Sequence, residues 1–149
     1  MESSDTAKRQ HWMAVLARAS RTHLATLMAD FSDYPAPEIV RPAETGTVMA
    51  EGRAGGTGAR FNIGEVTATR CVVRVDGRLG FSYALGRDRA KAELAATLDA
   101  LLQNPERQEA LLTKIITPLA QEEKEARELA SRKAAATKVD FFTLIRGDE

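Results

Sequence analysis

The beginning of the chain carries the apolar spacing of amphipathic helices. Apolar side chains recur at i, i+3, i+4 and i+7 in two successive segments that start at Trp12 and at Leu24, so each segment would place them on one helical face. Ser20 lies between the segments, and serine is favoured immediately before a first helical turn. Pro35 and Pro37 follow the second segment and cannot continue a helix. We predict two short helices with a break near Ser20.

Between residues 38 and 86, valine, isoleucine, threonine and aromatic residues are interrupted by glycine, a pattern typical of strands and turns. Asp76-Gly77 indicates a tight hairpin, because both residues tolerate the positive φ angles of such turns. We predict an antiparallel sheet of about four strands, which is a common sheet size. The expected strands are Ile39–Arg41, Thr47–Arg53, Val66–Val75 and Leu79–Leu85.

The last of these strands has two unlike faces. Side chains alternate along a strand, so its small residues (Gly80, Ser82, Ala84) share one face and its large residues share the other. Large apolar side chains are most easily used in a hydrophobic core, and we therefore expect Phe81 and Tyr83 to be buried. The large residues of the strand are Leu79, Phe81, Tyr83 and Leu85.

Helical spacing returns after the sheet. Asp88 and Asn104-Pro105 have the chemistry of helix starts, and Thr117-Pro118 should break or kink the helix that contains it. Residues 121–138 are charged and rich in alanine, which predicts a solvent-facing helix. The whole pattern predicts an α+β fold with two N-terminal helices, a roughly four-stranded antiparallel sheet and then C-terminal helices, in a single domain over residues 1–149.

Composition limits the classes of function. Lys plus Arg total 21 and Asp plus Glu total 21, so the formal net charge is zero. General nucleic-acid binders carry a strong basic excess, and we therefore predict that the chain does not bind nucleic acid. The zero balance leaves little charge repulsion between copies and weakly favours a chain that is bound to partners. The single Cys71 excludes an internal disulfide and a Cys-rich zinc site. Met1–Gln10 has no apolar signal core, and no apolar run approaches ~20 residues, so we predict a cytoplasmic protein that does not span a membrane.

The chain offers few residues for catalysis on its own. Its only histidines, His11 and His23, lie beside the apolar stripes of the two N-terminal helices, where partly buried boundary residues are common. Metal-ligand spacings such as H-x-x-x-H or C-x-x-C are absent from the sequence. We predict no catalytic residue, no metal site and no cofactor bound by this chain alone.

Two features have the chemistry to contact a phosphate. The run of Gly55, Gly56 and Gly58 could expose backbone N–H groups, but it lacks the Lys-Ser/Thr ending of a P-loop, and a plain loop between two strands is favoured. The planar fork of arginine pairs with phosphates and carboxylates, and arginine is frequent between residues 36 and 90, where lysine is absent. These arginines are Arg41, Arg53, Arg60, Arg70, Arg74, Arg78, Arg87 and Arg89.

Two interpretations of these arginines stay open. They pair with nearby acidic side chains such as Glu38 and Glu44 on a solvated face, or they contact a ligand or a partner. Alternation places Arg70 and Arg74 on one face of their strand. RNA recognition would require exposed aromatic side chains for base stacking, which the expected burial of the aromatic residues disfavours. The candidate phosphate-binding or interface residues are Gly55, Gly56, Gly58, Arg60, Arg70, Arg74 and Arg87.

The C-terminal segment becomes apolar again after the charged helix. Phe141, Phe142, Leu144 and Ile145 cannot all face one side of a core. Either they close the core of this domain or, together with Arg146, they anchor the chain to a partner.

Short strings along the chain resemble one known family. They occur in order over nearly the whole sequence, and together they are similar to the small G subunit of the bacterial carbon–phosphorus lyase core complex. The strings are Arg9-Gln10-His11-Trp12-Met13, Glu44-Thr45-Gly46, Gly55-Gly56-Thr57-Gly58 with Arg60-Phe61, Gly64-Glu65, Leu79-Gly80, Gly86-Arg87-Asp88, Asp99-Ala100-Leu101 and Val139-Asp140-Phe141-Phe142-Thr143.

The resemblance implies a role in phosphonate utilisation. The complex of that family uses ATP and an alkylphosphonate such as methylphosphonate, and it forms ribose 1-methylphosphonate 5-triphosphate with release of adenine. In that family, the displacement of adenine is attributed to a larger, nucleosidase-like subunit, and the small subunit is required for this activity. The expected partners are therefore the other subunits of the complex, and ATP is a substrate of the complex. The alternative is a free-standing nucleotide- or phosphate-binding protein that uses Gly55–Gly58 and Arg60.

Overall fold

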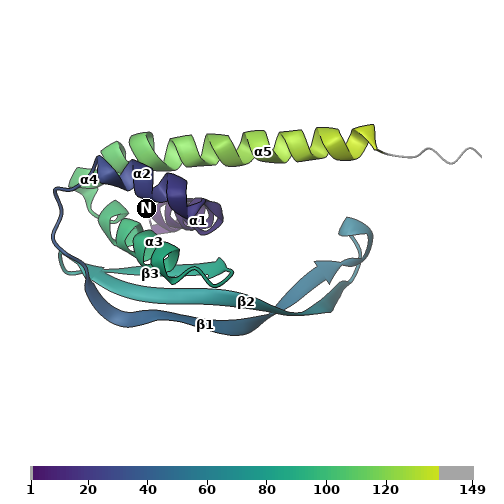
Figure 1. Cartoon of the computed structure of the whole chain (residues 1–149), viewed down its shortest axis with the longest axis horizontal. Coiled ribbons are helices and arrows are strands. Elements are labelled where there is room, and N and C mark those ends of the chain that lie inside the picture. Colours follow the sequence, from purple (N-terminus) through teal and green to yellow (C-terminus); the bar gives the residue numbers. More distant parts are fainter. Residues whose placement is uncertain (1, 138–149) are drawn as a thin grey trace, which may run out of the picture.

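The computed structural model describes residues 2–137, and their elements form a three-stranded antiparallel sheet with helices on one of its faces (Figure 1). This arrangement confirms the predicted α+β class. The elements in chain order are α1 (Glu2–Arg18), α2 (Arg21–Ala29), β1 (Glu38–Arg53), a 3-10 turn (Ala54–Gly56), β2 (Arg60–Val75), β3 (Arg78–Leu85), α3 (Arg89–Leu102), α4 (Pro105–Leu111), a π-helical segment (Leu112–Ile116) and α5 (Thr117–Ala136).

The helix starts that the sequence indicates are present. The side chain of Ser20 accepts a hydrogen bond from the backbone N–H of His23 at 3.2 Å, which confirms the break between α1 and α2. Asp88 caps α3 and Asn104 caps α4 in the same way. Each cap satisfies a backbone donor that the first helical turn leaves without an intrahelical partner.

The prediction of about four strands is wrong, because the first two expected strands belong to one strand, β1. Register shifts lie between Ile39 and Arg41, just before Pro42, and between Arg41 and Glu44, across Pro42. Proline has no N–H for a ladder and is tolerated on edge strands and at bulges. These irregularities let β1 pass Pro42 without leaving the sheet.

The strands differ in length, and this difference produces a projecting arm. β3 pairs with β2 only from Ala68 to Val75, whereas β1 and β2 continue to pair as far as Arg53 and Arg60. We call the two-stranded part, residues 47–67, the arm. Figure 1 shows the arm extending beyond the packed helices, with its end curving up toward the side on which α5 projects.

The core lies between the inner face of the sheet and the helices. α3 crosses this face and contributes fully buried side chains such as Leu98 and Leu102, against which α1 and α2 place Trp12, Leu16 and Leu24. A helix that packs on a sheet with one apolar stripe buries that stripe from water. The mostly exposed part of α3 is its first turn, close to the N-cap.

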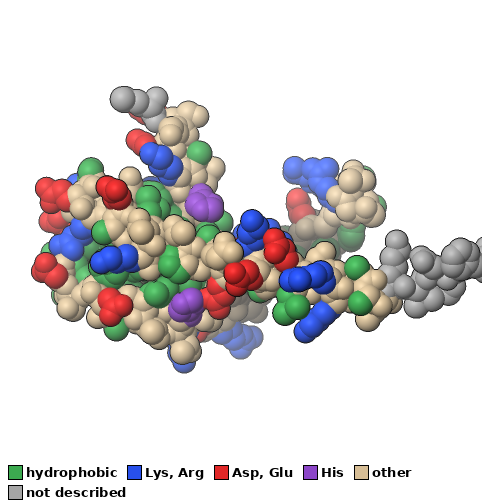
Figure 2. All heavy atoms as spheres, turned by 90° about the horizontal axis from the view of Figure 1, so that it is seen from above, with side chains coloured by type: hydrophobic (Ala, Val, Ile, Leu, Met, Phe, Trp, Pro, Cys, Tyr) green, Lys and Arg blue, Asp and Glu red, His purple; other side chains and the backbone are tan. Residues whose placement is uncertain are grey.

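The break expected at Thr117-Pro118 takes the form of a π-helical segment directly before α5. Pro118 cannot donate the usual helical hydrogen bond, and a local change in helical pitch accommodates a missing donor. α5 is solvent-facing over most of its length, as predicted, and carries mixed acidic and basic side chains (Figure 2). Within residues 2–137, no helix combines the length and apolar character needed to cross a bilayer.

Candidate interaction surfaces

The outer face of β3 exposes its large side chains. The predicted alternation is confirmed, but the expectation that Phe81 and Tyr83 are buried is wrong. Gly80, Ser82 and Ala84 turn toward α3 and are buried, because α3 lies too close to β3 for larger side chains to fit between them. The four large residues therefore point to solvent with exposed fractions of 39% for Leu79, 41% for Phe81, 51% for Tyr83 and 70% for Leu85.

Charged pairs lie beside this apolar row on the same face of the sheet. Arg70 is opposite Tyr83 on one side and Glu44 on the other, and its Nε donates to the Glu44 carboxylate at 2.8 Å. Arg74 pairs with Glu38 at 3.2 Å. The hydrogen bond from Arg70, together with its charge, holds the pKa of Glu44 below its ordinary value. We call the surface formed by these four charged residues and the four large residues of β3 the outer face.

The two arginines of the outer face are thus partnered by glutamates, as the first interpretation of the sequence allows. Their charges are compensated locally, which makes Arg70 and Arg74 poor candidates for an anion site. The exposure of Phe81 and Tyr83 removes one sequence argument against RNA binding, since aromatic side chains are available on the sheet. The compensated charge of the outer face still disfavours a polyanion there.

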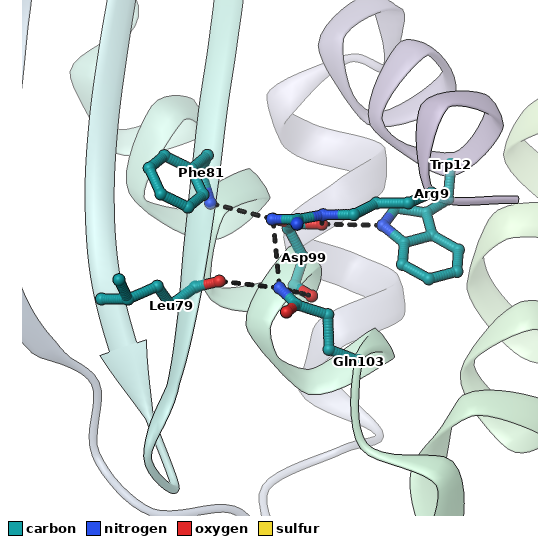
Figure 3. Close-up of polar contacts among 6 residues, drawn as sticks. All are labelled: Arg9, Trp12, Leu79, Phe81, Asp99 and Gln103. Atoms are coloured by element: carbon teal, nitrogen blue, oxygen red, sulfur yellow. Dashed lines mark hydrogen bonds and ion pairs between the residues drawn. The ribbon is translucent and has the colours of Figure 1, made fainter. Parts of the chain in front are cut away.

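A buried aspartate fixes β3 against the helices (Figure 3). The Asp99 carboxylate on α3 is fully buried and accepts hydrogen bonds from Trp12 Nε1 at 2.8 Å, from the backbone N–H of Phe81 at 2.9 Å, and from two nitrogens of Arg9 at 2.8 and 3.2 Å. Gln103 Nε2 donates to the carbonyl oxygen of Leu79 at 2.7 Å. These contacts join α1, α3 and the free edge of β3.

The Asp99 cluster also occupies hydrogen-bonding groups that an edge strand usually leaves open. The position of Phe81 on the outer face is consequently set by its own backbone bond to α3, and the guanidinium of Arg9 lies 5.6 Å from the centroid of the Phe81 ring. Sequence reasoning missed this cluster. The available signal was one acidic residue inside the apolar run Leu98–Leu102.

The remaining phosphate candidates lie in two other places. Gly55, Gly56 and Gly58 form the turn that joins β1 to β2 at the end of the arm, as the plain-loop interpretation predicts, and Arg60 begins the strand after it. The register places Arg53 directly opposite Arg60. Arg87 follows β3 and lies next to Gly86, whose N–H donates to Thr67 at the base of the arm. The predicted residues therefore do not form one site.

The histidines occupy the surface of the helical layer. His11 is exposed on α1, and the side chain of His23 pairs with Glu122 on α5. The predicted partner-interface residues Phe141, Phe142, Ile145 and Arg146 lie outside the described residues, so their role stays a prediction.

Comparison with known proteins identifies the family. The sequence model of the family described as phosphonate metabolism protein PhnG matches residues 7–147. The alpha-D-ribose 1-methylphosphonate 5-triphosphate synthase subunit PhnG of Rhizobium meliloti (strain 1021) is 39% identical over 152 aligned positions, which cover 99% of this chain and 95% of the relative. Trp12 and Asp99 of the buried cluster and the whole outer face lie inside the matched range. The chain belongs to the PhnG family of phosphonate metabolism proteins.

Proposed function

We propose that this chain is an accessory subunit of a synthase complex that joins an alkylphosphonate such as methylphosphonate to the ribose of ATP and releases adenine. The product of this reaction is ribose 1-methylphosphonate 5-triphosphate. Family membership and the name of the Rhizobium meliloti relative support this assignment. The chain acts in phosphonate metabolism as one subunit of a transferase, and ATP is a substrate of the assembly.

The strongest structural support for a role as a subunit is the exposed apolar row of the outer face. Four large apolar side chains in one row are exposed on a strand whose position is fixed by the buried Asp99. Contiguous exposed apolar surface with a polar border is typical of a protein-binding site, and aromatic residues are enriched in such sites. Because β3 is held rigidly, this surface would be ordered before a partner binds, which lowers the entropic cost of association.

We assign the outer face to the large, nucleosidase-like subunit of the complex. The displacement of adenine requires groups that act on the ribose and on the leaving base. In the part of the chain that the structure describes, both histidines lie on the surface of the N-terminal helices, and the side chain of His23 already pairs with Glu122. We infer that the chain contributes surfaces and that the partner contributes the reacting groups, and we expect no cofactor to be bound by this chain alone.

Co-expression tests the proposal. The full chain is produced with the other subunits, a tag is placed on the large subunit, and the amount of co-purified small chain is measured. Tyr83→Glu combined with Leu85→Glu should leave the circular dichroism spectrum unchanged and abolish co-purification, since both side chains are exposed. Leu129→Glu is the matched control, because Leu129 is an exposed apolar residue of α5. Retention of the outer-face variant, or failure of the unaltered chain to co-purify, would contradict the proposal.

A free-standing nucleotide-binding protein is the second candidate. The close position of Arg53 and Arg60 beside the glycine turn favours it, because two guanidinium groups pair well with phosphate oxygens. Calorimetric titration of the purified chain with ATP tests this candidate. A titration without heat of binding removes it.

A further inference from the structure

The end of the arm carries two arginines directly opposite each other. Arg53 is the last residue of β1 and pairs in register with Arg60, the first residue of β2. Residues opposite each other in an antiparallel pair lie on the same face, with Cβ atoms about 5 Å apart. Both side chains are exposed, and within residues 2–137 neither forms an ion pair. Figure 2, which views the molecule from the helical side, shows basic side chains at the end of the arm.

This pair differs from the other arginines of the sheet. Arg70 and Arg74 each have a glutamate opposite them, whereas Arg53 and Arg60 have each other. Like charges directly opposite destabilise a strand pair, and a two-stranded ribbon is only marginally stable in water. The arm therefore carries a repulsion that a bound anion would relieve.

The geometry of the turn holds the two arginines together. Gly55 and Gly56 adopt φ angles of 62° and 82°, which glycine tolerates best. The N–H of Gly58 donates to the carbonyl oxygen of Ala54 at 2.7 Å, and a Cβ on Gly58 would lie 2.5 Å from that oxygen. The turn is tight enough that the ends of β1 and β2 cannot separate without breaking it.

The two faces of the arm end have different chemistry. Arg53 and Arg60 line a shallow hollow of 350 Å³ together with Glu51 and Gly52. The neighbouring rung pairs Gly52 with Phe61 on the opposite face, where Phe61 and Ile63 are 49% and 65% exposed. One face is suited to an anion, and the other is suited to an apolar contact with a protein.

We propose that the arm inserts into the partner subunit and that Arg53 and Arg60 bind the triphosphate chain of the nucleotide. This inference rests on the proposed function. Phe61 and Ile63 seat the arm on the partner, and the guanidinium groups on the other face meet the phosphates. Two bidentate guanidinium groups, on side chains whose Cβ atoms lie about 5 Å apart, fit an anion with several oxygens along its length. A multiply charged anion is also favoured because Glu51 in the same hollow weakens the attraction for a single charge.

Steady-state kinetics of the assembled complex tests the inference. Complexes are prepared with Arg53→Gln, Arg60→Gln or the matched control Arg132→Gln, which removes an exposed arginine of α5. We expect each arm variant to co-purify normally and to raise KM for ATP about tenfold, the size of one lost charge-assisted hydrogen bond. KM for methylphosphonate should stay unchanged. Arg53→Lys should have an intermediate effect, because lysine keeps the charge and loses the fork.

Three outcomes would overturn the inference. An unchanged KM for ATP in the double variant of Arg53 and Arg60 excludes a phosphate contact. A raised KM for methylphosphonate alone assigns the arginines to the phosphonate. Loss of co-purification in the arginine variants assigns them to the protein interface. None of these results touches the proposed function, which fails if the unaltered chain does not assemble with its partners or if the outer-face variant is retained in the complex.

Discussion

Gly80 lies so close to α3 that a Cβ built on it would be 1.9 Å from the carbonyl oxygen of Ala96. No side chain fits between strand and helix at this point, and β3 therefore turns its small residues inward. Ser82, the next inward residue, donates its hydroxyl to the carbonyl oxygen of Ala92 at 2.6 Å. The close approach of β3 and α3 is thus the reason that Phe81 and Tyr83 face solvent.

Gly80→Ala should destabilise the protein severely. The atoms that the new methyl group would meet belong to the backbone of α3, at Ala96 and Ala100, so they cannot move aside by a change of rotamer. Overpacking of this kind costs about 3 kcal/mol, which is a large part of the stability of a small domain. Urea unfolding of the purified chain measures the loss. Gly46→Ala is the control and should stay within about 0.5 kcal/mol of the unaltered chain, because Gly46 has open space around its Cβ position.

Asp99→Ala should cost about 3 kcal/mol of unfolding free energy. The substitution removes the carboxylate that accepts hydrogen bonds from the N–H groups of Trp12 and Phe81. A buried donor that loses its charged acceptor lowers the stability of the folded state. Trp12→Phe deletes a single donor and should cost about 1 kcal/mol beyond its packing change. Urea unfolding with a double-mutant cycle of the two positions gives their coupling energy. Additive effects of the two substitutions would contradict the cluster in Figure 3.

The local elements were predictable from the sequence, and their tertiary roles were less so. The caps at Ser20 and Asp88 and the Asp76-Gly77 turn depend on neighbouring residues, and all three are present. Which face of β3 is buried depends on the distance between β3 and α3. Alternation along one strand shows which residues share a face, but it does not show which face packs against the helix. A burial rule for large apolar residues then selects the wrong face, because the closest helix–sheet contact needs glycine.

The candidate sites illustrate the same limit. The sequence indicates that Arg70 and Arg74 share a face, but their glutamate partners are on another strand and appear only once the register is known. The sequence does not distinguish Arg53 from the other arginines, because its proximity to Arg60 depends on which residues form the turn. Local patterns therefore indicate the chemistry that is present, while strand register decides which groups meet.

The thiol of Cys71 should react slowly in the folded chain. Cys71 is buried against the carbonyl oxygen of Arg41, and burial raises the pKa of its thiol. A raised pKa lowers the fraction of reactive thiolate at neutral pH, and burial restricts access of the reagent. Native protein should react with a disulfide reagent at least about a hundredfold more slowly than urea-unfolded protein. Equal rates in the two states would contradict the burial of Cys71 in the sheet.

The Glu44 carboxyl should titrate at a lower pH than an ordinary glutamate. The side-chain hydrogen bond from Arg70 is the main cause of the lowered pKa, followed by the charge of Arg70, with Arg41 contributing less. Because the pKa is lower in the folded chain, the pair stabilises the fold above the ordinary carboxyl pKa. That contribution is lost as the pH falls through the lowered value. It is small at this solvent-exposed position and is screened by salt. In a nuclear magnetic resonance titration, the midpoint of Glu44 should return toward the ordinary value in Arg70→Gln. It should move less in Arg41→Gln. An unchanged midpoint in Arg70→Gln would exclude the Arg70–Glu44 pair in solution.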